Sequence, residues 1–279
     1  SPDYMSFNNL DNTNIKKKYF KTEKLKKIIT GLRHIRDDHY HSYQRGNPLL
    51  MSWNLFNRSL KRRFKVERIK AFYTPPSPHE KFILYPLHFH PESSTSILSG
   101  TYLDEFEVIR NIAFNLPQNL HLYVKDHISA FGLPSLDFYR KLSNLPNVRL
   151  IAPNAQTKNL IRNSEAVITL TSTVGYEALL LNKPVFLFGE VFYKNHKNVI
   201  KIQNPSKIFE YLSALHKNRE NTLENENYNL QFVSAYYLNT LPGSLNLMLS
   251  EDQAKNLANT IYPLIEKEAL QNLSFYAVS

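Results

Sequence analysis

The 279-residue chain contains no cysteine, which excludes disulfides, cysteine-ligated zinc and thiol nucleophiles. It has no apolar run near the roughly 20 residues that a membrane-spanning helix needs, and its first residues lack the charged, apolar and small-residue zones of a signal peptide. The GxxxxGKS/T loop of P-loop NTPases and the GxGxxG motif of dinucleotide oxidoreductases are also absent. We therefore expect a folded, soluble protein outside these two enzyme classes, with a cytosolic location as the default.

Positive charge is the unusual feature of the composition. The chain has 34 Lys and Arg against 24 Asp and Glu, a net charge of +10, while its 42% hydrophobic content can supply a sizeable core. An excess of cations predicts an anionic partner, which can be nucleic acid, an acidic membrane surface, a nucleotide-activated substrate or an acidic polymer. Because the aromatic residues lie mostly in apolar runs, we expect no nucleic-acid partner.

Residues 1–75 differ in pattern from the rest of the chain. Basic clusters at 16–18, 24–27 and 61–63 alternate with apolar residues at helical intervals, which predicts a basic helical region. The charges form either solvated helix faces or a patch that holds an anionic membrane surface or polymer. The histidines and aspartates within 34–41 match no recognised ligand spacing, so we expect no metal site.

Strands and helices alternate after a proline-rich break at residues 74–78. This order predicts an α/β fold, a Rossmann-like parallel sheet with flanking helices, in a domain of residues 79–279. The expected strands are 81–87, 120–125, 148–151, 166–170, 184–188 and 198–202, and the expected helices include 136–142, 157–163 and one within 100–116.

The last third of the chain is predicted to be mainly helical. Asn204 and Pro205 make a good helix start, whereas the polar segment 218–229 is expected to be an exposed loop. A capping box at Ser250 opens another helix, which should run at least to Tyr262 before a proline ends or kinks it.

The turn after the strand at 166–170 contains the most informative polar cluster. Thr171, Ser172 and Thr173 gather hydroxyls and free N–H groups at a helix N-terminus, an arrangement that suits an anion, typically phosphate. Gly175 would let a ligand approach the backbone, and Glu177 can accept from sugar hydroxyls. The alternative is that Thr173 caps the helix and Glu177 complements its dipole.

Two further polar turns follow strands of the same predicted sheet. In the first, His90 or Glu92 can act as acid, base or nucleophile, unless this is simply a capped loop. In the second, Lys125 can neutralise phosphate and His127 can bond a phosphate or ribose, unless the turn is merely exposed and polar. Ligands of such sheets bind at the carboxyl ends of the strands, so the three turns together predict a nucleotide-sugar site.

Four segments carry a family resemblance: FILYPLHFHPESSTS, LYVKDH, NVRLIAP and VITLTSTVGYEALLLNKPVFLFG. Over residues 81–193 the chain resembles the capsular polysaccharide biosynthesis family of bacterial glycosyltransferases, which includes β-Kdo transferases that use CMP-Kdo. The resemblance implies a GT-B architecture, in which two Rossmann-like domains face a cleft and the C-terminal one holds most of the nucleotide.

The resemblance also implies roles in donor binding. Lys125 and His127 fall on a Lys-x-His-Pro motif whose histidine meets the nucleotide, although Ile128 stands where that motif has proline. Ser172 and Thr173 match a Ser/Thr pair at the phosphate.

Two more elements match the family pattern. Glu177 lies in a Glu-Ala-Leu element that resembles GT-B donor sites, and His90 and Glu92 match a His/Gln-Pro-Glu turn that faces the cleft. Residues 1–75 are too short and too helical for a complete N-terminal Rossmann domain, so we expect them to be a remnant or linker of one.

These patterns predict the donor-binding part of a glycosyltransferase that needs no cofactor or metal. Its partners would be a nucleotide-sugar donor, a lipid-linked or polysaccharide acceptor and, at the inner face of the cytoplasmic membrane, a peripheral contact with anionic lipid. The rival enzyme is a polyol-phosphate or sugar-phosphate transferase of the teichoic-acid type, which would share the phosphate site. The rival of another class is a non-catalytic module that binds anionic polymers through its basic surface.

Overall fold

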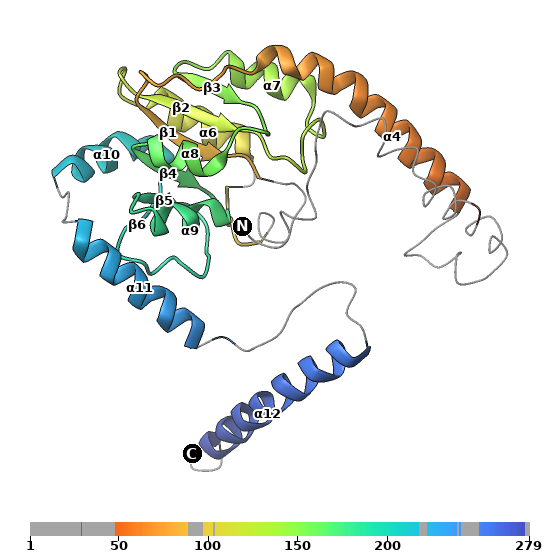
Figure 1. Ribbon diagram of the computed structural model, residues 1–279, viewed down its shortest axis with the longest axis vertical. Helices are drawn as coiled ribbons and strands as arrows, with labels where there is room; N and C mark the ends of the chain where they lie inside the picture. The colour runs from red at the N-terminus through yellow and green to blue at the C-terminus, as the bar shows by residue number, and fades with distance from the viewer. Residues whose placement is uncertain are drawn as a thin grey trace.

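A six-stranded parallel sheet, flanked by helices, forms the core of the α/β part of the molecule (Figure 1). The computed structural model describes residues 29, 48–88, 97–102, 104–217, 222–238, 240 and 251–276. The strand order is β3-β2-β1-β4-β5-β6, and every neighbouring pair is parallel. The strands are β1 Phe82–Pro86, β2 His121–Lys125, β3 Val148–Ile151, β4 Ala166–Thr169, β5 Val185–Leu187 and β6 Val199–Lys201. This is the doubly wound order of Rossmann-like folds, so the predicted fold class is confirmed, and each predicted strand end lies within one residue of the observed one.

Three of the helices that connect the strands begin at a side-chain cap. Asp104, Ser135 and Ser172 each accept a hydrogen bond from an N–H in the first turn of the helix that comes next, which explains why these helices start where they do. The connecting helices are α6 Glu105–Phe114, α7 Leu136–Ser143, α8 Thr157–Asn163 and α9 Thr173–Leu180, followed by η4 Pro205–Lys207 and α10 Ile208–Lys217.

Hydrophobic clusters cover both faces of the sheet. Side chains alternate along β1, so Ile83 and Tyr85 join the cluster under α6, α7 and α10, whereas Phe82 and Leu84 join the cluster under α8 and α9. All five residues of β1 are buried, as expected for a central strand of a parallel sheet. The two faces therefore differ in their helices, and they also differ in the polar groups at their carboxyl ends.

The expected loop at 218–229 is wrong from residue 222 onward, because α11 spans Thr222–Leu238, while 218–221 lie outside the described residues. Asn229 is buried, and its amide nitrogen donates to the Leu179 carbonyl (2.9 Å) and to Asn182 Oδ1 (2.8 Å). Its Oδ1 lies 2.9 Å from His196 Nε2. These tertiary contacts hold a segment whose composition alone favours a loop.

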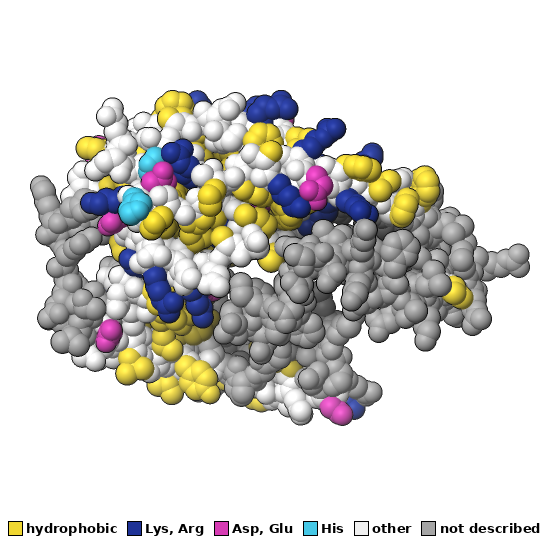
Figure 2. Space-filling view, turned by 45° about the horizontal axis from the view of Figure 1, so that its top comes forward, with side chains coloured by type: hydrophobic (Ala, Val, Ile, Leu, Met, Phe, Trp, Pro, Cys, Tyr) yellow, Lys and Arg dark blue, Asp and Glu magenta, His cyan; other side chains and the backbone are white. Residues whose placement is uncertain are grey.

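Among the described residues, α4 Pro48–Ile69 and η3 Lys70–Phe72 precede the sheet in sequence, and α11 and α12 Glu251–Tyr276 follow it. α12 continues through Pro263, so that residue does not end the helix. Ile69 at the end of α4 is fully buried in the hydrophobic cluster under α6 and α7. Figure 2 shows hydrophobic and basic side chains together along the part of α4 that extends away from the sheet. The helix predicted around the basic cluster at 24–27 falls outside the described residues, apart from residue 29.

Candidate functional site

His88, the second residue after β1, is buried and joins three elements at the carboxyl edge of the sheet. Its Nε2 accepts from the Thr171 N–H at 3.3 Å, so Nδ1 carries the ring proton and donates to Glu105 Oε1 at 2.7 Å. Glu105 opens α6, and the same oxygen accepts from the His88 N–H (3.1 Å) and from the Tyr85 hydroxyl (3.2 Å). This network fixes the turn after β1 against α6 and against the entrance of α9.

His88 and Glu105 escape prediction because their contact joins residues 17 positions apart in two different elements. The position of His88 directly after a buried strand is the one sequence feature that marks it. His90 and Glu92, to which the sequence assigns the acid, base or nucleophile, lie outside the described residues, and their role stays a prediction.

The entrance of α9 is capped by Ser172 and not by Thr173, since Ser172 Oγ accepts from the Val174 N–H at 3.2 Å. The N–H groups of Thr171, Ser172 and Gly175 also have acceptors within the chain. Four of the N–H groups expected to be free for an anion are therefore bonded. The hydroxyls differ: Thr171 Oγ1 is buried without a hydrogen-bond partner among the described residues, and Thr173 is exposed.

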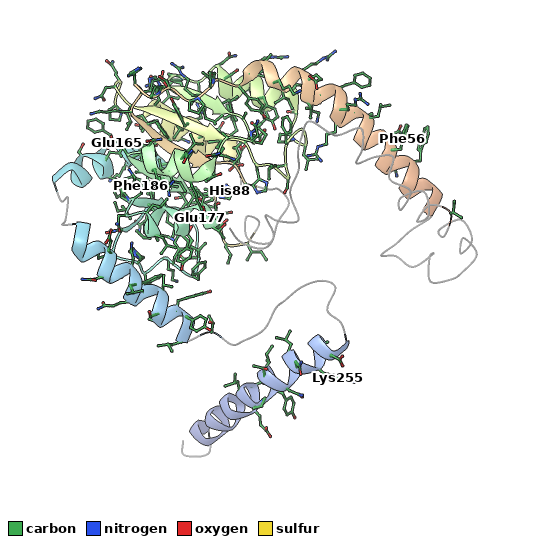
Figure 3. The ribbon with its side chains drawn as sticks, in the orientation of Figure 1. Phe56, His88, Glu165, Glu177, Phe186 and Lys255 are labelled. Atoms are coloured by element: carbon green, nitrogen blue, oxygen red, sulfur yellow. The ribbon has the colours of Figure 1, made fainter. Side chains whose placement is uncertain are left out.

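Gly175 lies inside α9 and packs against the segment after β5. A Cβ at this position would lie 2.5 Å from the Tyr193 hydroxyl, which donates to the Ser172 carbonyl oxygen at 2.5 Å. The space that the missing side chain leaves is thus filled by Tyr193 and is not open to a ligand. Glu177, two residues further along α9 (Figure 3), is half-buried, and no described residue bonds its carboxylate.

Lys125 ends β2 and is buried with an unusual set of partners. Its ammonium donates to the carbonyl oxygens of Pro153 (3.1 Å) and Asp126 (3.4 Å), and it forms no salt bridge with a described residue. Burial lowers the pKa of Lys125 to about 8, and the nearby Asp126 charge opposes that shift only in part. A buried cation of this kind is a candidate for binding an anion.

Asp126, the next residue, faces the opposite side of the sheet and is fully engaged. Its Oδ2 accepts from the hydroxyls of Tyr73 (2.5 Å) and Tyr139 (2.9 Å), and its Oδ1 accepts from the His127 N–H (2.7 Å). Burial raises the pKa of Asp126, and these three donors oppose the rise. The half-buried His127 accepts from the Ser129 N–H through Nδ1 at 3.2 Å, which fixes the direction of its ring.

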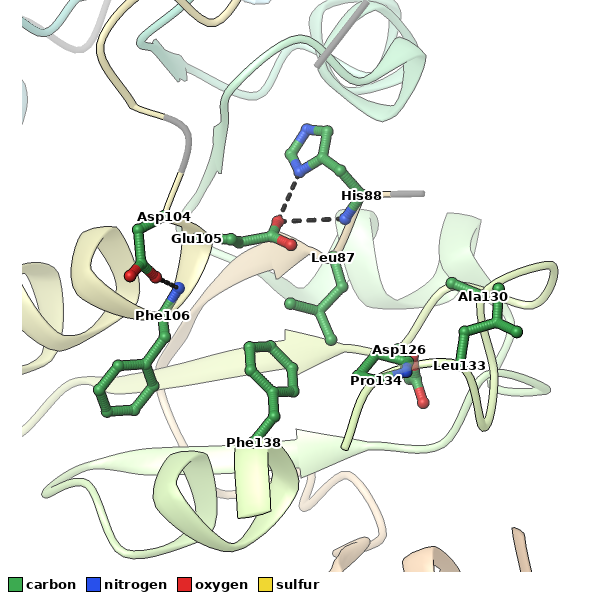
Figure 4. Close-up of a pocket in the computed structure, with 10 residues that line it drawn as sticks. All are labelled: Leu87, His88, Asp104, Glu105, Phe106, Asp126, Ala130, Leu133, Pro134 and Phe138. Atoms are coloured by element: carbon green, nitrogen blue, oxygen red, sulfur yellow. Dashed lines mark hydrogen bonds and ion pairs between the residues drawn. The ribbon is translucent and has the colours of Figure 1, made fainter. Parts of the chain in front are cut away.

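A cavity of about 620 Å³ opens on the α6 and α7 side of this edge (Figure 4). Its volume lies within the about 300–1,000 Å³ typical of small-molecule sites. Apolar side chains and three carboxylates line it, together with His88, and no Lys or Arg is among these described lining residues. They are Leu87, His88, Asp104, Glu105, Phe106, Asp126, Ala130, Leu133, Pro134 and Phe138.

The predicted site residues thus fall into two groups instead of one cluster. Lys125 ends β2 and Ser172 follows β4, and β1 lies between these two strands in the sheet. The backbones of Lys125 and Ser172 are therefore about 10 Å apart by the usual strand spacing. Neither residue lines the cavity, and nor does His127 or Glu177. In the part of the chain that the structure describes, no three His, Asp or Glu side chains are arranged to hold a metal ion, and no helix is long and apolar enough to cross a membrane.

The strand order and the polar turns at its carboxyl edge define an open, doubly wound α/β protein. Within that class, the chain belongs to the family described as capsule polysaccharide biosynthesis protein, whose model matches residues 8–230.

Two curated relatives match part of the chain. The capsule polysaccharide modification protein LipA of Neisseria meningitidis serogroup B is 29% identical over 94 residues, which are 34% of this chain and 13% of LipA. Protein FixF of Sinorhizobium fredii is 28% identical over 151 residues, which are 52% of this chain and 33% of FixF. The chain thus matches a third or less of the length of either relative.

Among solved structures, the β-Kdo 2,7 transferase KpsC of Thermosulfurimonas dismutans is similar at 20% identity with a TM-score of 0.38. The similarity covers 53% of this chain and 47% of the KpsC chain.

Proposed function

We propose that this chain is the donor-binding part of a glycosyltransferase that transfers Kdo from CMP-Kdo in the synthesis of bacterial capsule or surface polysaccharide. Membership of the capsule polysaccharide biosynthesis family supports the pathway, and the doubly wound sheet supports a nucleotide-linked donor. The observation that carries the proposal is the buried Lys125 ammonium at the carboxyl edge.

Lys125 suits an anionic donor because its charge is poorly compensated. Two carbonyl oxygens solvate its ammonium less well than water does, as its lowered pKa of about 8 reflects. A phosphate nearby would favour the charged form and remove most of this penalty. Lys125 would thereby hold the phosphate and stabilise the charge that develops on it when the sugar leaves, without a metal.

The entrance of α9 would contact the same phosphate from the other side of β1. Thr171 Oγ1 is buried without a partner among the described residues, and an acceptor on a ligand would satisfy its hydroxyl proton. Because most N–H groups of this turn are already bonded, hydroxyls and the helix dipole, and not a cradle of amides, would make the contact. His127, next in sequence to the engaged Asp126, would meet the base or ribose, and Glu177 would accept from sugar hydroxyls.

The rest of the reaction would be supplied by groups beyond this site. His90 or Glu92 would act as the acid, base or nucleophile, and the acceptor would be a lipid-linked or polysaccharide chain. The proposal places the protein at the inner face of the cytoplasmic membrane, where a lipid-linked acceptor is available.

A nucleotide panel with a cap-preserving variant tests the donor site. We expect CMP to raise the melting temperature more than CDP or UDP does, because a ligand stabilises the state that it binds. Ser172→Asp keeps a good N-cap but sets a negative charge beside the phosphate, so nucleotide affinity should fall about tenfold or more. Ser135→Asp makes the same substitution at the N-cap of α7 and should leave affinity unchanged.

Equal CMP affinity in Ser172→Asp and Ser135→Asp would exclude the α9 entrance as the phosphate site. A stronger response to CDP than to CMP would favour the teichoic-acid type of transferase. No response to any of the three nucleotides, with salt-sensitive binding of an acidic polysaccharide, would favour the non-catalytic module.

A further inference from the structure

α4 has one face that packs against the sheet domain. Arg62 Nε donates to the Phe131 carbonyl at 2.6 Å, and Lys65 Nζ donates to the carbonyls of Leu133 (3.2 Å) and Pro134 (3.0 Å). Val66 and Ile69, on the same side of the helix, are buried in the domain. This face supplies the contacts that hold α4 in place.

The opposite face of α4 is a row of large apolar side chains that point to solvent. Trp53, Phe56, Leu60 and Phe64 are 61%, 58%, 42% and 69% exposed. Their spacing of three, four and four residues places them on one stripe, about 180° around the helix from the packing face at about 100° per residue. Figure 3 shows Phe56 on the side of α4 away from the sheet.

Basic residues flank this stripe. By the same helical spacing Lys61 lies on one side of it and Arg63 on the other, and both are exposed. Glu67, the acidic residue near the stripe, is paired with Lys70 at 2.9 Å. An apolar row with aromatic residues and flanking cations is the pattern of helices that lie in the interface of an anionic bilayer.

We propose that this outer face of α4, defined by Trp53, Phe56, Leu60 and Phe64, binds the surface of a membrane that contains anionic lipid. The aromatic and Leu side chains enter the boundary between headgroups and acyl chains, while Lys61 and Arg63 contact lipid phosphates. The net charge of +10 adds a long-range attraction to the same surface. The inference deepens the membrane placement in the proposed function, yet it rests on α4 and not on nucleotide binding.

The chain offers a reporter within this face, because Trp53 is its single tryptophan. With vesicles of phosphatidylcholine and phosphatidylglycerol at 3:1, we expect the protein to sediment with the vesicles and the tryptophan emission to shift to the blue. With vesicles of phosphatidylcholine alone, binding should be about tenfold weaker because the lipid charge is missing.

A pair of double variants separates this face from exposed aromatic residues in general. Phe56→Ser with Phe64→Ser should weaken vesicle binding at least tenfold. Phe114→Ser with Phe209→Ser removes two aromatic residues that are 63% and 54% exposed on α6 and α10, and it should leave binding unchanged. Lys61→Gln with Arg63→Gln should remove most of the preference for anionic vesicles.

Several outcomes would overturn the proposal. The protein could fail to bind both kinds of vesicle, or it could bind without a blue shift of the tryptophan emission. The two aromatic double variants could also lose vesicle binding to the same extent. A blue shift that appears on raising the protein concentration without vesicles would identify a second copy of the chain as the occupant. CMP stabilisation of the same variants is measured separately, so failure of the membrane face and failure of the donor site are distinguishable.

Discussion

Both sides of the carboxyl edge of the sheet contain buried polar side chains, but these differ in how completely they are hydrogen-bonded. On the α6 and α7 side, Asp126 is surrounded by three hydrogen-bond donors, and Glu105 accepts three hydrogen bonds on one oxygen. On the α8 and α9 side, Lys125 has two carbonyl partners and Thr171 Oγ1 has none among the described residues. Polar groups at this sheet edge thus divide into those that are fully hydrogen-bonded and those that have few or no partners among the described residues.

The two sides of the edge are therefore expected to have different roles, one in folding and the other in ligand binding. The engaged carboxylates tie the strand ends to η3, α6 and α7, so their removal should affect folding. The buried charge of Lys125 lowers the stability of the fold, so we expect Lys125 to contribute to ligand binding and its removal to weaken binding without destabilising the fold. Substitutions on each side of the edge test this division.

The largest effect is expected from Asp126→Ala. Two tyrosine hydroxyls and one N–H would lose their buried acceptor, which should lower the free energy of unfolding by about 3 to 4 kcal/mol. Urea denaturation measures the loss. The control Asp137→Ala removes an exposed carboxylate of α7 and should change the free energy of unfolding by less than about 0.5 kcal/mol. A similarly small loss for Asp126→Ala would show that its hydrogen bonds are not structural.

The second effect is a pH dependence that Lys125 imposes on stability. Its pKa is about 8 in the folded protein against an ordinary 10.5, so the unfolded chain binds more protons between these values and stability rises with pH across this window. The gain in the free energy of unfolding should be about 3 kcal/mol. Comparison with Lys125→Met cancels the contribution of every other ionisable group to the pH curve. Parallel pH curves for the two proteins would contradict a buried ammonium at this position.

A smaller effect is expected on ligand binding at pH 7. Lys125→Met removes the cation but keeps most of the side-chain volume, so CMP affinity should fall about tenfold, or about 1.4 kcal/mol, in calorimetry. The ligand-free protein should be at least as stable as the parent, because the buried charge is gone. Lys158→Met, at an exposed lysine on α8, is the matched control. A loss of stability without a loss of affinity would place Lys125 with the structural groups.

Much of the fold could be predicted because short buried runs such as 148–151 and 166–170 are bounded by polar turns. The alternation of strands and helices predicts a parallel sheet with right-handed crossovers, whereas the particular strand order comes only from the structure. α11 could not be predicted, since Asn229 favours a helix only through partners on α9 and after β5.

The site was less predictable than the fold. Sequence identifies which turns lie at the carboxyl edge, but not which groups there are already bonded. Tyr73 lies 53 positions before Asp126, and Tyr193 lies 21 positions after Ser172, so no local pattern reveals either contact. The division of the edge into a fully hydrogen-bonded side and a side with few partners among the described residues therefore emerges only from tertiary structure.

The contacts of α4 with residues 129–134 also matter for cooperativity. Gly132 has φ of +77°, and a Cβ there would lie 2.8 Å from Val66 Cγ2, so the helix and this loop leave no room between them. Together with the bonds from Arg62 and Lys65, this close fit means that the loop cannot open while α4 stays docked. The helix with the outward aromatic row and the loop that begins beside Lys125 therefore form one unit in local unfolding, and their amide hydrogens should exchange together.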